Sequence, residues 1–439
     1  MASDDLLDRP NILFITCHDL GRHLGCYGIE TVHSPNFDRL ASTGVRLTRA
    51  FATASSCSPS RAAMATGRYP HSNGVMGLTH PPFGWDLRPG ERHIAQILND
   101  AGYGTHLFGF QHVSPYDDRL QFGWIHTDHN RGLAGPVSEK VATLLQAHNH
   151  HRPFYVEVNL EEPHRPYDQG NCCPDDSLGV TVPGYLPPSQ ESRIEMAGLQ
   201  GAVRQADAAI GRMLDALDDA GLARRTLVIF ASDHGIAMPR AKCTLYDPGL
   251  EVAMLLRWPR GFEGGRSIDD LISNIDLLPT MLELAGVPVP ENVQGKSFAP
   301  RLRGETFVPR AAIHAEKTYH TYYDPIRAVR TERFKYIRNF EPAPHVEVPA
   351  DIARGPIYRA NVELYTCAEH VPAELYDVEA DALEQNNLAG DSDYESVQTW
   401  LDSMLTAWMC DSADPLVEHP VPLPGFQSGD ATAGRPAAC

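Results

Sequence analysis

Residues 55–74 (SSCSPSRAAMATGRYPHSNG) contain side chains that could attack and bind an anion. Cys57 and Arg61 flank Pro59 in the spacing C-x-P-x-R, which places a nucleophile close to a fixed cation. Because proline is common in the first turn of a helix, we expect a helix to begin near Pro59 or Ser60 and to point its free N–H groups at the anion. Arg61 could hold two oxygen atoms of that anion through its planar guanidinium.

Two further groups of polar residues follow apolar runs that have the composition of buried strands. His18 and Asp19 come after the run NILFIT, and Asp233 and His234 come after the run TLVIFAS. In parallel α/β sheets, ligands bind beyond the carboxyl ends of the strands. We therefore expect these four side chains to lie at the ligand-binding edge of a sheet.

Runs typical of buried strands alternate with helical patterns along most of the chain. Strands are expected at Asn11–Thr16, Gly104–Gly109, Phe154–Leu160, Thr226–Ser232 and Val252–Leu256. Helices between them are expected at His93–Asp100, Val137–Ala147 and Ile275–Ala285. This alternation predicts an α/β fold with a mostly parallel central sheet that helices cover on both faces.

The longest helix is expected at Arg193–Ala220. Apolar residues recur there every three or four positions, and Gly221 stands where a C-terminal cap is expected. The stretch Val180–Ser189, which contains three prolines, is expected to form a loop that shapes the substrate pocket.

The chain changes in character after about residue 308. Ile326–Arg330 and Phe334–Arg338 flank the turn-like sequence TER and predict a β-hairpin, and a final helix is expected at Tyr394–Trp408. We therefore predict a large α/β domain over 1–308, a smaller α+β domain with an antiparallel sheet and a helix over 309–414, and an extended or disordered tail over 415–439.

Composition and charge narrow the functional classes. Of the 439 residues, 42% are hydrophobic and 21% are charged, which is typical of a globular protein. The net charge of −19 argues against a nucleic-acid partner, because phosphate binding needs a basic surface. The acidic start MASDDLLDRP and the short apolar run after it predict neither a signal segment nor a membrane partner, so a cytoplasmic location is expected. The nine cysteines are scattered and are expected to be reduced, apart from Cys57.

Several motifs together resemble the sulfatase family of the alkaline-phosphatase superfamily, and within it the sulfamidases (heparan N-sulfatases). They are CSPSR with AAMATGR after it, HSNGVMGL, GFQHV, EPHR, TLVIFASDHG, TLYDPG, IRAVRTERFKYIRN, and AELYD followed by QNNLAG. They extend over roughly residues 9–409. The resemblance implies an alkaline-phosphatase-like domain with a smaller C-terminal domain. It also implies a hydrolase that releases inorganic sulfate from a sulfate ester or a sulfamate on a small molecule or saccharide.

The resemblance implies that Cys57 is oxidised to formylglycine by a maturation system and becomes the nucleophile. One hydroxyl of the aldehyde hydrate would bind a divalent metal, which lowers its pKa, and the second would allow later elimination of sulfate. The implied metal ligands are His18, Asp19, Asp233, His234 and residue 57 itself. Calcium is expected by resemblance. All-oxygen sites favour Ca²⁺ or Mg²⁺, whereas imidazole ligands favour Mn²⁺ or Zn²⁺.

Two positions depart from the family pattern. His18 stands where the family has the first of two aspartates, so it either binds the metal through nitrogen or lies behind the ligands. Phe110 stands where the family has a lysine, so one cationic contact to sulfate is missing or comes from elsewhere. Lys242 matches the basic residue that faces sulfate. His112 and His164 match histidines that could transfer a proton to or from the leaving group.

The sequence leaves other functions open. Asp-His at positions 233 and 234 also resembles phosphonate monoester hydrolases, so a phosphonate monoester or phosphodiester hydrolase with the same nucleophile is an alternative. His18 and Phe110 leave open a catalytically silent binder of sulfated glycans. The identity of the sulfated substrate and the formation of a homo-oligomer are also left open. By their position in the chain, further candidates for the substrate pocket are His71, Tyr246, His320 and Tyr322.

Overall fold

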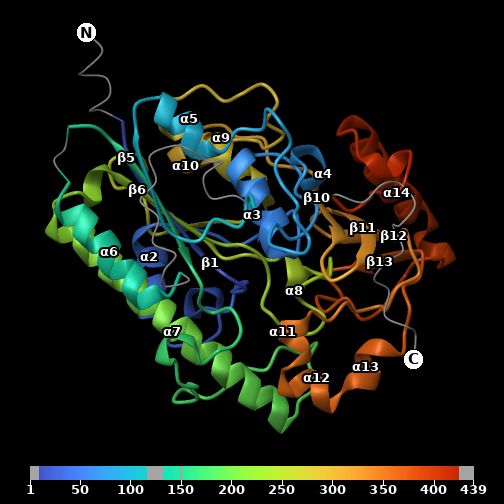
Figure 1. Cartoon of the computed structure of the whole chain (residues 1–439). Coiled ribbons are helices and arrows are strands. Elements are labelled where there is room, and N and C mark those ends of the chain that lie inside the picture. Colours follow the sequence, from blue (N-terminus) through green and yellow to red (C-terminus); the bar gives the residue numbers. More distant parts are fainter. Residues whose placement is uncertain (1–8, 116–131, 149–150, 425–439) are drawn as a thin grey trace.

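The computed structural model describes residues 9–115, 132–148 and 151–424 and is built around two main sheets (Figure 1). The larger sheet has seven strands in the order β4-β5-β1-β6-β7-β2-β8. β1 pairs in parallel with β5 and β6, and β5 pairs in parallel with β4. The strands are β1 Asn11–Cys17, β2 Val45–Leu47, β4 Gly104–Gly109, β5 Phe154–Leu160, β6 Thr226–Ser232, β7 Met254–Arg257 and β8 Arg266–Ile268.

Successive side chains of a strand point to opposite faces of the sheet, so the strands contribute to two cores. Helices cover both faces and complete these cores. Leu13 and Ile15 share a core with residues of α2 (Pro35–Thr43), α6 (Ala134–Gln146) and α7 (Gln190–Asp219). Ile12 and Phe14 share the opposite core with residues of α3 (Cys57–Thr66), α5 (Ile94–Asp100), α9 (Leu277–Leu284) and α10 (Ala299–Arg303). The prediction of a mostly parallel sheet between two layers of helices is confirmed.

The strand expected at Val252–Leu256 is present and is an antiparallel member of the mostly parallel sheet. β7 begins at Met254 and pairs antiparallel with β6 and with β2. After β6 the chain forms only a loop and the short helix α8 (Asp247–Leu250) before it re-enters the sheet beside β6. A parallel strand would need a crossover connection to the other end of the sheet, and this segment contains none.

Two helices begin earlier than the sequence indicates. α7, expected at Arg193–Ala220, spans Gln190–Asp219, because the Ser189 hydroxyl accepts a hydrogen bond from the Ser192 N–H (3.3 Å) and caps the helix. α3 begins at Cys57, and not near Pro59 or Ser60. The Ser60 N–H donates to the Ser56 carbonyl (3.2 Å), so the first turn already closes around residue 57.

The second sheet is antiparallel and has four strands in the order β10-β11-β12-β13. Its hairpin, β11 Tyr323–Arg330 with β12 Phe334–Asn339, is the predicted one. The predicted final helix is α14 (Glu395–Asp411), whose Leu401 and Leu405 share a core with Val329 of β11. The other two strands are β10 Ile313–Tyr319 and β13 Ala373–Asp377.

The connection between β12 and β13 returns to the larger sheet. It contains three short helices, α11 Ala350–Ala353, α12 Pro356–Ala360 and α13 Val362–Thr366, and lies beside α7 (Figure 1). Ile357 belongs to the same core as α7, and the backbone N–H of Ile357 donates to the Glu195 carboxylate (2.7 Å). The segment therefore reaches the edge at which β1 and β6 end.

The remaining elements are short. They are β3 Ala50–Phe51 paired with β9 Ile272–Ser273, helix α4 Pro70–Asn73, and the 3-10 helices η1 Gly25–Tyr27, η4 Gln169–Asn171, η5 Ala223–Arg225, η6 Asn274–Asp276, η7 Ser392–Tyr394 and η8 Pro415–Val417. Of the expected tail, residues 415–424 form η8 and a stretch with Val421 buried, and the rest lies outside the described residues. Across the described ranges, we find no helix with the length and apolarity of a membrane span.

Candidate active site

The carboxyl ends of β1 and β6 lie side by side and join two distant parts of the chain. Asp19 follows β1 with a left-handed backbone (φ 57°), and its N–H donates to Asp233 Oδ1 beyond β6 (3.0 Å). The same oxygen accepts the N–H of His234 (2.9 Å), and the Gly21 N–H donates to the His234 carbonyl (2.9 Å). These bonds hold the two loops in a fixed relation to each other.

The four side chains expected at this edge form one buried cluster. His234 Nε2 lies 3.0 Å from Asp19 Oδ1 and 3.8 Å from Asp233 Oδ1. His18 Nε2 lies 3.6 Å from Asp233 Oδ2. Burial lowers the pKa of His18 well below its usual value, so its ring stays neutral. Burial alone would also lower the pKa of His234, but Asp233 and Asp19 outweigh it and raise the pKa to about 10.

This cluster has the donor atoms and the unmet bonding that a metal ion would satisfy. His18, Asp19, Cys57 and Asp233 each offer a ligand atom, and these atoms lie within 4.8 Å of one another. Both ring nitrogens of His18 are buried without a hydrogen bond in the described part of the chain. Since buried polar atoms are almost always bonded, the residues present fit a divalent cation.

Cys57 is the first residue of α3 and is 5% exposed. Burial raises the pKa of its thiol, and Lys242 and His234 offset part of that effect. The free N–H groups and the positive end of a helix favour negative charge beside its first turn. Because α3 begins at Cys57, residue 57 lies at the N-terminus of the helix, where an anion is stabilised.

Arg61 lies one turn into α3 and bonds to three strand ends. Its Nε donates to Asp233 Oδ2 (3.0 Å), and its Nη1 donates to Thr16 Oγ1 (2.7 Å) and Asn159 Oδ1 (3.0 Å). Its Nη2 is buried and makes no hydrogen bond with a described residue. The guanidinium is thus fixed in place and keeps one unused donor group.

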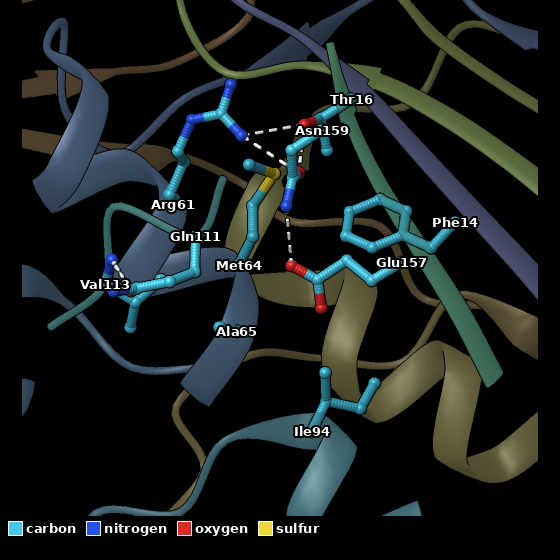
Figure 2. A pocket seen from close by; sticks show the side chains of 10 residues that line it. All are labelled: Phe14, Thr16, Arg61, Met64, Ala65, Ile94, Gln111, Val113, Glu157 and Asn159. Atoms are coloured by element: carbon cyan, nitrogen blue, oxygen red, sulfur yellow. Dashed lines mark hydrogen bonds between the residues drawn. The ribbon is translucent and has the colours of Figure 1, made fainter. Parts of the chain in front are cut away.

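A small cavity lies beside Arg61, between α3 and the ends of β1 and β5 (Figure 2). On its wall, Asn159 Nδ2 donates to Glu157 Oε1 (3.0 Å), and Glu157 Oε2 accepts the hydroxyl of Tyr155 (2.8 Å). The amide of Asn159 therefore connects the Arg61 guanidinium to a buried carboxylate. Through this amide, the Glu157 carboxylate balances part of the Arg61 charge without a direct ion pair between the two side chains.

Phe110, at the position of the missing lysine, packs against Arg61. The centre of its ring lies 4.6 Å from the guanidinium carbon of Arg61, 5.2 Å from the His18 ring and 4.4 Å from the His112 ring. Burial and, to a smaller extent, Arg61 lower the pKa of His112 to about 3. Phe110 thus supports one cation through a cation–π contact and adds no second charge.

Lys242, His164 and Asp351 form the outer side of the site. Lys242 Nζ donates to Asp19 Oδ2 (2.9 Å) and to Asp351 Oδ2 (3.0 Å), and it lies 3.5 Å from His164 Nε2. His164 stacks on His18 with ring centroids 4.3 Å apart. Burial alone would lower the pKa of Lys242, but Asp19 and Asp351 hold it well above its usual value. The lysine therefore stays cationic.

The structure brings together the residues named from the motifs, whereas His71, Tyr246, His320 and Tyr322 lie outside the cluster. His71 and Tyr246 are buried, so neither is placed to line an open pocket. Each of three side chains contacts a carboxylate outside the cluster: His71 Nδ1 lies 2.8 Å from Glu316, Tyr246 OH donates to Glu374 (2.7 Å), and His320 Nδ1 lies 3.4 Å from Glu347.

Sequence reasoning missed Thr16, Asn159 and Asp351. Thr16 and Asn159 are polar residues near the carboxyl ends of mainly apolar strand runs, and that position was a usable signal. Asp351 stands 109 residues after Lys242 in a segment without a recognisable motif. Only the path of the connection that contains α11 brings it to the site.

Comparison with known proteins identifies the family. The family model described as "Sulfatase" matches residues 10–287, and the model described as "N-sulphoglucosamine sulphohydrolase, C-terminal" matches residues 240–363. An ulvan-active sulfatase of Formosa agariphila is 29% identical, over 96% of this chain and 84% of the relative. Human N-sulphoglucosamine sulphohydrolase is 28% identical, over 94% of this chain and 92% of the relative.

Solved structures share the fold. One, determined in complex with its substrate D-glucosamine-2-N,6-O-disulfate, aligns with a TM-score of 0.70 at 19% identity and covers 94% of this chain and 99% of its own. The phosphonate monoester hydrolase of Agrobacterium radiobacter aligns with a TM-score of 0.69 at 20% identity and covers 92% of this chain and 96% of its own. The match over residues 10–287 covers well over half of the chain. The chain therefore belongs to the sulfatase family and is a sulfuric ester hydrolase.

Proposed function

We propose that this sulfatase hydrolyses an N-sulfated amino sugar or a related small sulfated saccharide and releases inorganic sulfate. The observation that carries the proposal is the convergence of Cys57, Arg61 and Lys242 on two buried carboxylates, Asp19 and Asp233. This arrangement offers a nucleophile position and two fixed cations around one small volume. The choice of an N-sulfated sugar is supported by the family match over residues 240–363 and by the human relative.

In this proposal, residue 57 is formylglycine, made from Cys57 by a maturation system, and supplies the attacking oxygen. Arg61 orients that oxygen and one sulfate oxygen through its unused Nη2. Lys242 contacts the sulfate from the outer side, where it remains charged. His164, 3.5 Å from Lys242, is placed to donate a proton to the departing amine or alcohol.

Asp19, Asp233, His18 and His234 would hold a divalent cation, which supplies Lewis-acid stabilisation of the nucleophile and of the sulfate charge. Calcium is the ion that the family resemblance favours. The two imidazoles in the cluster favour Mn²⁺ or Zn²⁺ instead. The metal content of the active protein decides between these alternatives.

The test is a desulfation panel with protein in which mass spectrometry of the peptide containing residue 57 confirms the aldehyde. The panel contains glucosamine N-sulfate, O-sulfated sugars and an aryl sulfate. We expect turnover of glucosamine N-sulfate with the highest kcat/KM, complete loss in Cys57→Ala, and full activity in the control Cys367→Ala, which changes an exposed thiol. A persistent thiol at residue 57 in native material, or activity in Cys57→Ala, would contradict the proposal.

A phosphonate monoester or phosphodiester hydrolase is the second candidate. The observation in its favour is the Asp233-His234 pair, in which the imidazole lies against Asp19 at 3.0 Å. Sulfate and phosphonate esters have similar shapes, so the same nucleophile could serve both. Assays with a phenylphosphonate ester beside an aryl sulfate distinguish the two functions.

A further inference from the structure

A second group of possible metal ligands lies in the C-terminal part of the molecule, apart from the active site. His345, His370 and Glu374 each offer a ligand atom, and these atoms lie within 4.8 Å of one another. All three line a cavity of about 10 Å³, whose wall also includes Tyr246 and Asn339. A cavity of that size has room for a single atom or small ion.

Backbone pairing brings the three residues together. The His345 N–H donates to the Ala368 carbonyl (2.8 Å), and the His370 N–H donates to the Ala343 carbonyl (2.9 Å). The two loop segments therefore lie antiparallel, and their histidine rings are 6.0 Å apart. Glu374 is in β13, directly after the second loop segment. Glu374 thus attaches the group of three possible ligands to the second sheet.

His370 is oriented as a metal ligand usually is. Its Nε2 lies 3.3 Å from Asp324 Oδ2, and its Nδ1 is buried without a hydrogen bond to any described residue. A carboxylate beside one ring nitrogen fixes the tautomer and leaves the other nitrogen with its lone pair. Asp324 is itself held by Lys317 Nζ at 2.5 Å.

Glu374 is a buried carboxylate without a cationic partner among the described residues. It is 2% exposed, and it accepts hydrogen bonds from Tyr246 OH (2.7 Å), Tyr376 OH (2.7 Å) and Asn339 Nδ2 (2.9 Å). These neutral donors orient the carboxylate but do not balance its charge. An uncompensated buried carboxylate is costly, and a divalent cation in the adjacent cavity would remove that cost.

We propose that His345, His370 and Glu374 form a structural binding site for a divalent transition metal of borderline softness, for which Zn²⁺ is the probe. Two imidazoles and one carboxylate are ligands that zinc accepts readily. The Tyr246 hydroxyl donates to Glu374 and lies 3.1 Å from His345 Nε2, so it can accept a hydrogen bond from the Nε2 proton and leave Nδ1 of His345 with its lone pair. The ion would join the second sheet to the segment containing Cys243 and Tyr246, which directly follows Lys242.

The test measures zinc in the full chain after chelation, reloading with Zn²⁺ and removal of free ion. We expect wild type to retain one equivalent more than His345→Ala, His370→Ala and Glu374→Gln, whereas the exposed-histidine control His33→Ala retains the wild-type amount. Asp233→Asn, which alters the active-site cluster, is expected to keep the equivalent bound at His345, His370 and Glu374.

Zinc-edge anomalous diffraction of the wild-type protein gives a readout that needs no variant. We expect a peak between the three side chains, and we expect Zn²⁺ to raise the Tm of wild type but not of Glu374→Gln. The proposal is overturned if no peak lies within bonding distance of His370, or if the three variants retain as much zinc as wild type. Neither result depends on sulfatase activity.

Discussion

The Asp351 carboxylate lies 3.0 Å from the Lys242 ammonium, and it comes from a helix in the connection between two strands of the second sheet. Lys242 is therefore held between two carboxylates, Asp19 on its inner side and Asp351 on its outer side. The side chain of Asp351 is 21% exposed, whereas that of Asp19 is fully buried. An anion that approaches Lys242 from solvent must meet the Asp351 charge first.

Replacing Asp351 by asparagine is expected to strengthen the binding of simple anions. The substitution removes one of two negative partners of Lys242 and leaves the ammonium freer to bind sulfate. For a partly exposed pair we expect an effect of about 1 kcal/mol, which is about a fivefold lower inhibition constant for inorganic sulfate. The control is Asp393→Asn at an exposed position. An unchanged or higher inhibition constant would show that Asp351 does not compete with the anion.

Replacing Arg61 by lysine is expected to lower kcat by about 10²–10³ with a much smaller change in KM. Lysine keeps the charge, but it cannot bond to Asp233, Thr16 and Asn159 and also reach the substrate. Steady-state kinetics with an aryl sulfate provide the measurement, and Arg193→Lys on the exposed face of α7 is the control. A change confined to KM would mean that Arg61 only attracts the substrate.

Asn159→Ala is expected to lower the free energy of unfolding by about 2–4 kcal/mol. The amide of Asn159 lies between the Arg61 guanidinium and the Glu157 carboxylate (Figure 2), and it also donates to the Phe110 carbonyl (2.6 Å). Its loss removes a hydrogen-bond partner from four buried groups, those of Arg61, Thr16, Glu157 and Phe110, beside a cavity too small for several waters. Denaturant unfolding is the measurement, with the exposed Asn386→Ala as reference. Equal free energies of unfolding for Asn159→Ala and Asn386→Ala would argue against a stabilising role of the hydrogen bonds around Asn159.

Chelation of the active-site metal is expected to abolish turnover, and each divalent ion can then be added back alone. Saturation at about 100 times Kd would also add about 2.7 kcal/mol of stability, measured as a higher Tm. His18→Asp is expected to shift the preference among re-added ions toward Ca²⁺, because it replaces an imidazole by a carboxylate. If the variant and wild type rank the ions identically, His18 is not a ligand.

The folded protein is expected to lose stability at acid pH because of Asp247. Burial alone would raise its pKa, but Lys335 and Arg330 outweigh this and lower the pKa to about 2. The folded pKa is below the unfolded one, so the stabilisation is present above about pH 4 and is lost as pH falls toward 2, a loss of about 2 kcal/mol. Burial raises the pKa of Glu384 and Glu251, which also face Asp247, so both are already protonated in that window.

The measurement is unfolding free energy from pH 5 to pH 2 for wild type and Asp247→Asn. Wild type should lose more stability than the variant over that range, and the exposed Asp393→Asn should follow wild type. Parallel curves for wild type and Asp247→Asn would show that the cluster around Lys335 does not contribute to acid sensitivity.

Strand positions and the inner part of the site followed from local patterns. The apolar runs at 11–16 and 226–232 predicted two adjacent strands, and the polar residues directly after them met as expected. This prediction succeeds because side chains at the ends of parallel neighbours share one edge of the sheet. The start of α3 at Cys57 was missed, because Cys57 and Ser58 have weak helix propensity, and the turn depends on the backbone bond from Ser60 to Ser56.

The outer part of the site could not be predicted from the sequence. Asp351 reaches Lys242 only because α12 packs on α7, where the Glu195 carboxylate accepts the Ile357 N–H. Such contacts join segments that are far apart in the sequence, and no pattern of residues within either segment indicates that they will meet. The antiparallel direction of β7 could not be predicted for a similar reason, since a short apolar run has the same composition in either direction.

If residue 57 is converted to formylglycine, as proposed, the burial of Cys57 determines when that conversion can occur. In the folded protein, the thiol is covered at the first turn of α3 and only 5% of the residue is exposed, which leaves a modifying enzyme little access to it. Under the proposed function, oxidation to the aldehyde would therefore precede folding, while residues 55–74 are still an unfolded stretch of the emerging polypeptide. Each molecule would then have one short opportunity to become active, and a chain that folded before oxidation would remain inert. Rapid overproduction of this protein should thus yield well-folded material of low specific activity.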